Sequence, residues 1–294
     1  MLLMPIRLRE YHRPPDRNSA LELLRRSEGR TAPLVIGPRP IALSDLDLEA
    51  AVDLSRLGLD YIVESGDDYI HLGAMTPLQA LTNSPALQSL ASGLLSEAAK
   101  LAASASLRRL TTLAGAILSG GRPPEVLLAL LALDTTVVIQ GERAHEIPLT
   151  DFLGGEASLP QGEFLLELKF PLPSSAQVGG ALERLARTPR DEAIVAAAAV
   201  IGMDGKVCDR VRLALAGAGP RPQRIDQVER LLERQSLTPE LLQQVVATTT
   251  GAANPIPDYR ASAEYRREMA GVLARRALES AWQRAQVPSV PLVP

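Results

Sequence analysis

The sequence predicts an α+β protein in two parts, and three observations support this prediction. Short apolar strand patterns alternate with helical patterns over about the first 170 residues. Pro171, Pro173 and the adjacent serines favour an exposed, extended connection after them. Beyond this connection, an Asp-Gly pair separates two apolar runs, and helical patterns close the chain. We therefore expect two domains, at residues 1–172 and 173–294.

The first part begins with an expected helix at residues 18–26, for which Asn18 is the predicted N-cap, followed by a short buried strand at 33–37. Alternating apolar residues around a turn at 65–68 then predict a small meander of three strands. These strands are expected at residues 51–54, 61–63 and 69–72. Two further helices and two further strands are expected at 94–103 and 125–133, and at 135–140 and 163–170.

The second part contains the clearest local signals. Asp204 and Gly205 lie between apolar runs at 193–201 and 207–215, which predicts a β-hairpin. Thr238 followed by Pro239 is typical of a helix start. The three expected helices are at 224–233, 239–250 and 262–284. On the last of them, four residues recur at helical spacing and are predicted to face the core: Tyr265, Met269, Val272 and Leu273.

Composition excludes several classes of protein. Hydrophobic residues make up 46% and charged residues 22% of the 294 residues, which is typical of a folded globular chain and not of a disordered one. A net charge of −3 and an aromatic share of 3% argue against a nucleic-acid partner. The longest apolar runs, 126–133 and 193–201, are too short to cross a bilayer. Because Pro5, Arg7 and Arg9 interrupt the N-terminus, no export signal is expected, and we predict a cytoplasmic location.

The few potential metal ligands are scattered. A single cysteine, Cys208, can neither form an intramolecular disulfide nor hold an iron–sulfur cluster or structural zinc. His12, His71 and His145 are far apart, and none lies in a metal-binding spacing. We expect no metal in this chain, so any redox chemistry must come from a bound organic cofactor or a partner.

Three stretches could contact a nucleotide. In the first, LVIGPRP at 34–40, a strand runs into a turn at Gly37, but Pro38 and Pro40 remove two backbone donors. Arg39 could supply a compensating charge, or it could simply be solvated. The second stretch, TTLAGA at 111–116 and GGRPPE at 120–125, combines small residues with a helix start that can face an anion. A plain loop before a buried helix explains it equally well, and the third stretch, LGAMT at 72–76, says little alone.

Taken together and in order, these stretches resemble the FAD-binding (medium) subunit of the molybdenum hydroxylases, the family of carbon monoxide dehydrogenase and xanthine dehydrogenase. The resemblance runs from the YHRP start to the last helix. Its most specific segments are VDLSR at 52–56, LGAMT at 72–76, LLALLALD at 127–134, LALAG at 213–217 and AEYR through MAGVL to RRA between 263 and 277.

This resemblance implies a fold, a cofactor and partners. The expected fold is a two-subdomain FAD-binding domain of the PCMH (vanillyl-alcohol-oxidase-like) type, followed by a C-terminal antiparallel sheet with helices. The implied function is that of an oxidoreductase subunit, a flavoprotein that transfers electrons from an iron–sulfur small subunit to an external acceptor. The iron–sulfur subunit is in turn supplied by a molybdopterin large subunit, and the complex can form a homodimer of heterotrimers.

The same resemblance identifies candidate FAD-binding residues, none of which is catalytic in the sense of making or breaking bonds. They are Ile36, Gly37, Pro38, Arg39, Thr76, Arg108, Thr112, Ala114, Gly115, Ala116, Glu125 and Arg184. The chain departs from the family pattern at these positions. Ile36 and Ala114 replace glycines, Ala116 replaces an asparagine, and Leu182 and Arg184 stand where the family has Tyr-x-Lys.

These departures leave two interpretations. In the first, FAD is still bound, although more weakly, and the chain is an electron-transfer subunit. In the second, FAD has been lost, and the chain is a paralogue with a structural or assembly role in a molybdenum hydroxylase complex. Losing two or three donor contacts at about 1 kcal/mol or more each would lower the affinity for FAD by several decades, so the sequence leaves both interpretations open.

Overall fold

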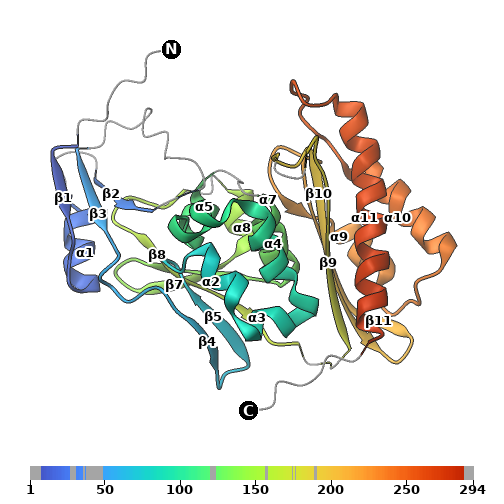
Figure 1. Ribbon diagram of the computed structural model, residues 1–294, viewed down its shortest axis with the longest axis horizontal. Helices are drawn as coiled ribbons and strands as arrows, with labels where there is room; N and C mark the ends of the chain where they lie inside the picture. Colours follow the sequence, from blue (N-terminus) through green and yellow to red (C-terminus); the bar gives the residue numbers. More distant parts are fainter. Residues whose placement is uncertain are drawn as a thin grey trace.

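The computed structural model describes residues 8–26, 31–35, 37, 49–119, 124–155, 158–173, 175, 177–188 and 191–287. Its strands form three separate sheets, which lie in a row from the N-terminal to the C-terminal part of the molecule (Figure 1). The central and C-terminal sheets are antiparallel, and helices pack against both. The predicted α+β class is therefore confirmed.

The first sheet is small and parallel. It consists of β1 (Glu10–His12), β3 (Ala50–Asp53) and β2 (Thr31–Leu34) in that order, with α1 (Arg17–Leu24) connecting β1 to β2. The predicted meander is confirmed only in its second half, where residues 62–65 and 69–73 pair as a hairpin, because β3 pairs with β1 and β2 instead of with the strands that follow it. Asn18 is also not the N-cap, since the Asp16 carboxylate accepts the bond from the Ser19 N–H at 2.9 Å.

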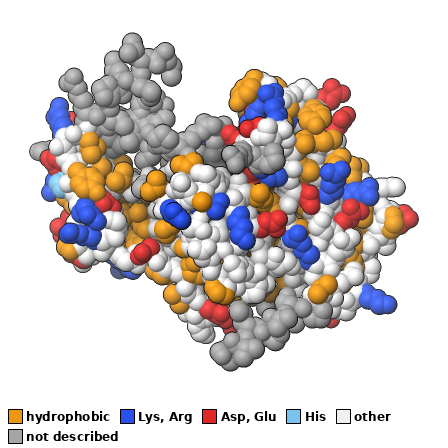
Figure 2. All heavy atoms as spheres, in the orientation of Figure 1, with side chains coloured by type: hydrophobic (Ala, Val, Ile, Leu, Met, Phe, Trp, Pro, Cys, Tyr) orange, Lys and Arg blue, Asp and Glu red, His pale blue; other side chains and the backbone are white. Residues whose placement is uncertain are grey.

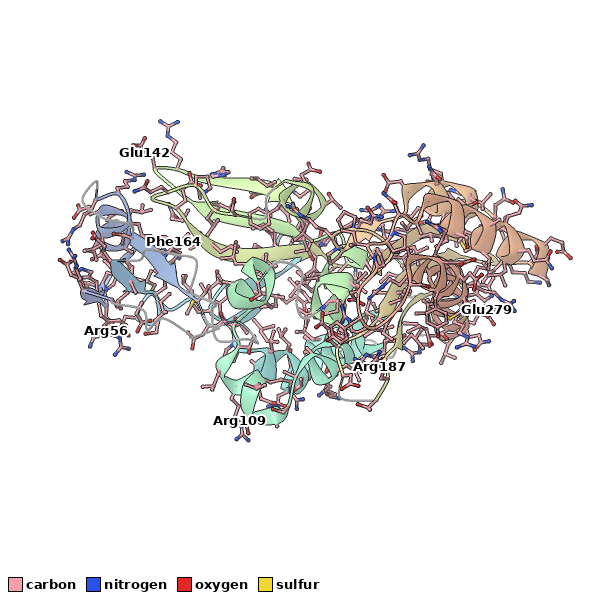
Figure 3. The ribbon with its side chains drawn as sticks, turned by 90° about the horizontal axis from the view of Figure 1, so that it is seen from above. Arg56, Arg109, Glu142, Phe164, Arg187 and Glu279 are labelled. Atoms are coloured by element: carbon pink, nitrogen blue, oxygen red, sulfur yellow. The ribbon has the colours of Figure 1, made fainter. Side chains whose placement is uncertain are left out.

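The second sheet has five antiparallel strands in the order β4-β5-β8-β6-β7. They are β4 (Ile62–Ser65), β5 (Tyr69–Gly73), β8 (Phe164–Pro171), β6 (Thr136–Gln140) and β7 (Ala144–Pro148). The chain leaves β5 for a run of helices and returns at β6, and these helices form a layer on one side of the sheet (Figure 3). They are α2 (Leu78–Asn83), α3 (Pro85–Ser89), η2 (Leu90–Gly93), α4 (Leu94–Ala102), α5 (Ala105–Leu110), α6 (Leu113–Leu118) and α7 (Pro124–Ala132), with α8 (Leu149–Gly154) following β7.

The third sheet confirms the predicted hairpin. Its order is β12-β11-β10-β9, with β10 (Val195–Asp204) and β11 (Val207–Ala216) joined at Gly205, whose φ is +61°. The other strands are β9 (Val178–Leu185) and β12 (Gln223–Arg224), and the helices are α9 (Asp226–Leu232), α10 (Pro239–Ala252) and α11 (Ala263–Ala285). Thr238 caps α10 as predicted.

The core-facing stripe predicted on α11 is largely wrong. Tyr265 is 42% exposed, and Met269 and Val272 are only half-buried. The buried face consists mainly of small residues: Ala270, Gly271, Leu273, Ala274, Ala277, Leu278, Ala281 and Ala285. Small side chains let α11 approach the sheet closely, so the face that packs is the one with alanines and not the one with large residues.

Helix α7 lies between the central and C-terminal sheets and has no exposed face. All nine of its residues are buried, and it contacts β10 and β11 as well as α4 and α6. Its side chains belong to one hydrophobic cluster that includes Val137 and Leu168 of the central sheet and Ala196 and Ala214 of the C-terminal sheet. The two predicted domains therefore share a core.

Two glycines of β9 allow this close packing. A Cβ atom at Gly179 would lie 2.1 Å from the Ala281 carbonyl oxygen of α11, and one at Gly180 would lie 2.4 Å from the Ala91 carbonyl oxygen of η2. Both obstacles are backbone atoms. Helical layers thus contact the two faces of β9 at adjacent residues, and neither position tolerates a side chain.

Asp134, which follows α7, connects the two parts through charge. Its carboxylate pairs with Arg210 and Arg212 of β11 and with Arg224 of β12, the Arg212 Nε lying 2.8 Å away. Burial alone would raise the pKa of Asp134, but the bond from Arg210 and the neighbouring guanidinium charges hold it below its usual range. Arg224 also donates to Glu229 of α9, so the cluster joins three elements to the end of α7.

Charged side chains of both signs are interspersed over the face shown in Figure 2, without a continuous patch of one sign. Among the helices in the described ranges, none is both long enough and apolar enough to cross a membrane.

We expect Gly179→Ala to lower the free energy of unfolding by about 3 kcal/mol, because the added methyl group would meet the α11 backbone. Gly251→Ala in α10 is the matched control. No atom lies within 4 Å of its Cβ position, so this substitution should stabilise the helix by up to ~1 kcal/mol. Urea unfolding of both variants tests the difference, and equal effects would contradict it.

We expect Asp134→Asn to lower the free energy of unfolding by about 3 kcal/mol. The substitution keeps the side-chain shape but leaves three arginines without their shared carboxylate. Asn also tolerates the left-handed backbone of this residue, which has a φ of +58°. Asp209→Asn is the control, because Asp209 pairs only with the exposed Arg234 and should cost under about 1 kcal/mol. Thermal unfolding measures both.

Candidate functional site

The structure brings two of the predicted nucleotide-contacting stretches together. The turn after β5 runs beside the segment before α6, where Leu78 N–H donates to the Thr111 carbonyl oxygen and Leu113 N–H donates to the Thr76 carbonyl oxygen. The Thr76 hydroxyl is also engaged, donating to the Tyr61 carbonyl oxygen at 2.9 Å. Residues 74–78 and 111–116 thus form one small loop cluster at the end of β5, although they are far apart in sequence.

Thr112 organises this cluster as the N-cap of α6. Its side-chain oxygen accepts the Gly115 N–H at 3.1 Å, and its carbonyl oxygen accepts the Ala116 N–H at 2.9 Å. The two remaining N–H groups of this turn donate elsewhere, from Leu113 to Thr76 and from Ala114 to Ala74. All four backbone donors of residues 113–116 are therefore paired within the protein.

Glu125 and Arg184 meet across the two parts of the molecule. Glu125 lies in the first turn of α7 and Arg184 in β9, with Arg184 Nε 3.0 Å from Glu125 Oε1. The two side chains are 3% and 13% exposed. Burial raises the pKa of Glu125, and the nearby Arg184 guanidinium opposes that shift. The sequence predicted both residues as cofactor ligands but gave no sign that they pair with each other.

Arg108 lies in α5, which leads directly into this loop cluster, and its bonds are to protein groups. It donates to the Gln79 side chain at 3.1 Å and to the carbonyl oxygens of Lys100 and Ala103 at 2.9 and 2.7 Å. These bonds hold α5 against α2 and the end of α4. Its neighbour Arg109 points outward from the helical layer (Figure 3).

Of the candidates near the end of β2, Gly37 is buried. Val35, two residues before it, belongs to the same hydrophobic cluster as Ala74 and Ala114, so the end of β2 reaches the core beneath the loop cluster. Ile36, Pro38 and Arg39 lie outside the described residues.

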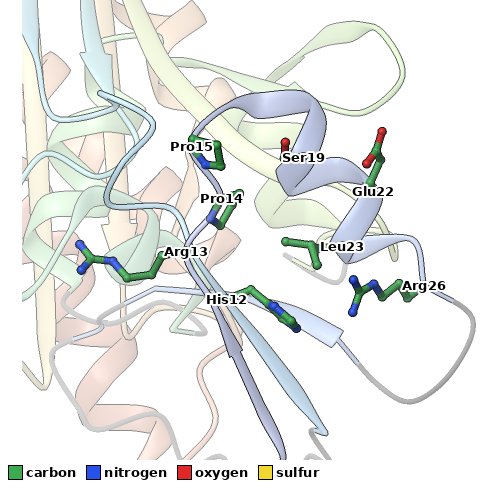
Figure 4. A pocket seen from close by; sticks show the side chains of 8 residues that line it. All are labelled: His12, Arg13, Pro14, Pro15, Ser19, Glu22, Leu23 and Arg26. Atoms are coloured by element: carbon green, nitrogen blue, oxygen red, sulfur yellow. The ribbon is translucent and has the colours of Figure 1, made fainter.

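Two cavities lined by described residues lie elsewhere. One of about 430 Å³ lies beside α1, and its lining includes His12, Arg13, Pro14 and Arg26 (Figure 4). Another of about 770 Å³ lies between α8 and β12 and includes Arg221 and Arg224. Neither is lined by any of the predicted cofactor residues.

Comparison with known proteins places this arrangement in a family. A family model described as the FAD binding domain in molybdopterin dehydrogenase matches residues 6–173, and one described as the CO dehydrogenase flavoprotein C-terminal domain matches residues 180–281. The chain belongs to this family. The predicted resemblance is therefore confirmed, as is the fold that it implied.

Full-length relatives agree. The chain is 31% identical to the carbon monoxide dehydrogenase medium chain of Afipia carboxidovorans, covering 94% of this chain and 98% of that one. It is 32% identical to the 6-hydroxypseudooxynicotine dehydrogenase complex subunit alpha of Paenarthrobacter nicotinovorans, over 80% of each. Among solved structures, carbon monoxide dehydrogenase from Hydrogenophaga pseudoflava is similar with a TM-score of 0.87 and 30% identity, covering 96% and 99% of the two chains.

Within the described residues, the turn at 113–116 offers a diphosphate no free backbone donor. A diphosphate needs unused backbone donors on a surface that it can reach. Here the four donors of residues 113–116 are paired internally, and the protein's own atoms leave only 5% of Thr112, 1% of Ala114 and none of Ala116 exposed. The predicted FAD site remains a prediction, because Ile36, Pro38 and Arg39 lie outside the described residues.

We expect Thr112→Ala to lower the free energy of unfolding by ~1 kcal/mol, because it removes the N-cap bond to Gly115 along with the γ-methyl group, which Thr112→Ser lacks as well. Thr112→Ser keeps the hydroxyl and should retain most of the stability. Urea denaturation of the two variants measures the difference, and an alanine variant as stable as the serine variant would show that the cap is unimportant.

Proposed function

We propose that this chain is the medium subunit of a molybdenum hydroxylase complex and that its role there is to organise the assembly without a bound flavin. Two observations support membership of a complex: both family domains occur in order over the whole chain, and relatives of similar length are called medium chains or complex subunits. We propose as partners an iron–sulfur small subunit and a molybdopterin large subunit, assembled in the cytoplasm, with two such heterotrimers forming the complete complex.

One observation carries the flavin-independent role. In the turn at residues 113–116, one of the stretches predicted to contact a diphosphate, the backbone donors are paired within the protein and the residues that bear them are buried. The two halves are meanwhile joined by packing and charge, through α7 and through Asp134. A subunit of this kind keeps its shape, and thus its docking surfaces, without a cofactor.

The second candidate function is FAD-dependent electron transfer from the iron–sulfur subunit to an external acceptor. The match to an FAD-binding domain model over residues 6–173 favours it, together with the retained Thr112 and Gly115. Flavin bound to the chain in stoichiometric amount would establish this function in place of the flavin-independent one.

We expect affinity purification of the tagged chain from its native host to recover an iron–sulfur protein and a large molybdopterin protein in fixed proportion. The flavin content of the same preparation, measured after acid release, should be far below one per chain. A lone monomer that recovers neither protein would contradict the proposed complex. Both partners together with stoichiometric flavin would instead support electron transfer.

A further inference from the structure

We infer that the family's cofactor site is closed in this chain by its own residues, and that the Glu125–Arg184 pair is the contact that closes it. The inference deepens the proposed flavin-independent role and rests on it. In place of the cofactor, the Arg184 guanidinium is held on the buried Glu125 carboxylate.

The Glu125–Arg184 pair joins the two parts of the molecule. Glu125 starts α7 and Arg184 lies near the end of β9, so their contact bridges the central helical layer and the C-terminal sheet. Both residues are among the positions that the family resemblance assigns to FAD. The Glu125 side chain is only 3% exposed and lies against Arg184 at 3.0 Å, so its carboxylate presents almost no surface to the hydroxyl groups of a nucleotide.

A second acceptor, besides Glu125, holds Arg184 in place. Its guanidinium also donates to the Asp191 carbonyl oxygen, in the segment that leads into β10. Opening the site would therefore require Arg184 to leave a backbone acceptor as well as a carboxylate. Arginine suits this arrangement because its planar fork can serve two acceptors at once, whereas the lysine of the family pattern is a single point charge.

Glu125 is deeply buried, so its negative charge is destabilising unless a positive charge lies beside it. The carboxylate is 97% covered, and burial is the main influence on its pKa, which it raises. Arg184 from β9 stabilises the charged form, and Glu192 from the segment before β10 opposes it. Removing Arg184 leaves a buried carboxylate next to a second acid, so the pair is a structural requirement of the closed site.

The first experiment tests closure in the wild-type chain. The protein is incubated with excess FAD and desalted, and amide hydrogen exchange is followed with and without FAD. We expect no retained flavin absorbance, and slow exchange of the amides of residues 113–116 that FAD does not change. Retained flavin, or amides that exchange quickly until FAD is added, would overturn the inference.

The second experiment tests the pair. Arg184→Met leaves the Glu125 carboxylate buried without its partner and should lower Tm by roughly 10 °C at neutral pH. The raised pKa of Glu125 means that stability is regained as the pH falls, because protonation removes the buried charge below the folded-state pKa. The deficit should therefore be clearly smaller at mildly acidic pH.

The control is the double variant Glu125→Gln with Arg184→Met. It also lacks the bond to Asp191 but has no buried carboxylate at position 125, so it should be more stable than Arg184→Met at neutral pH and show no gain on acidification from this site. Equal Tm values and equal pH profiles for the two variants would overturn the role of the pair. Failure to recover partner subunits would leave these results intact, so the inference and the proposed complex can fail separately.

Discussion

The burial of α7 on every side is the constraint on which the rest of the structure depends. A helix without a polar face must be enclosed, and here the enclosure comes from two sheets that belong to different parts of the chain. Each end carries an acidic residue paired with arginine from the C-terminal sheet: Glu125 with Arg184 at the start, and Asp134 with three arginines just beyond the end. The helix thus fixes both the separation and the orientation of the two halves.

The contacts around β9 are also close. Helix α11 and η2 approach the strand at backbone distance, at Gly179 and Gly180 respectively, which the absence of a side chain at these two residues permits. On the η2 side, Ala91 and Ser92 adopt left-handed backbone conformations, which are costly for residues other than glycine. Such a conformation persists only where the surrounding packing determines it.

Features that depend on neighbours in sequence could be predicted. The hairpin at Asp204 and Gly205, the cap at Thr238 and the order of the later helices follow from local chemistry. Features that depend on distant partners could not. Nothing in the apolar pattern of residues 51–54 indicates whether that strand pairs with the next strands or with β1 and β2, and large residues on α11 gave no sign that alanines would form its packed face. The candidate site shows the same division. The turn at 111–116 was recognised, but the pairing of its donors and of Glu125 depends on contacts over long sequence distances.

The topology of the central sheet has a consequence for synthesis on the ribosome. Strand β5 pairs with β8, and Gly73 is the partner of Glu167. The middle of the sheet therefore cannot form until Glu167 has been synthesised. The helices between these strands emerge first, and α7 acquires its cover on the other side only when β10 and β11 have followed, ending at Ala216. Since chains grow from the N-terminus at about 5–20 residues per second, the apolar residues of α7 stay without this cover for several seconds. The N-terminal part released alone would expose the surface that the C-terminal sheet normally covers.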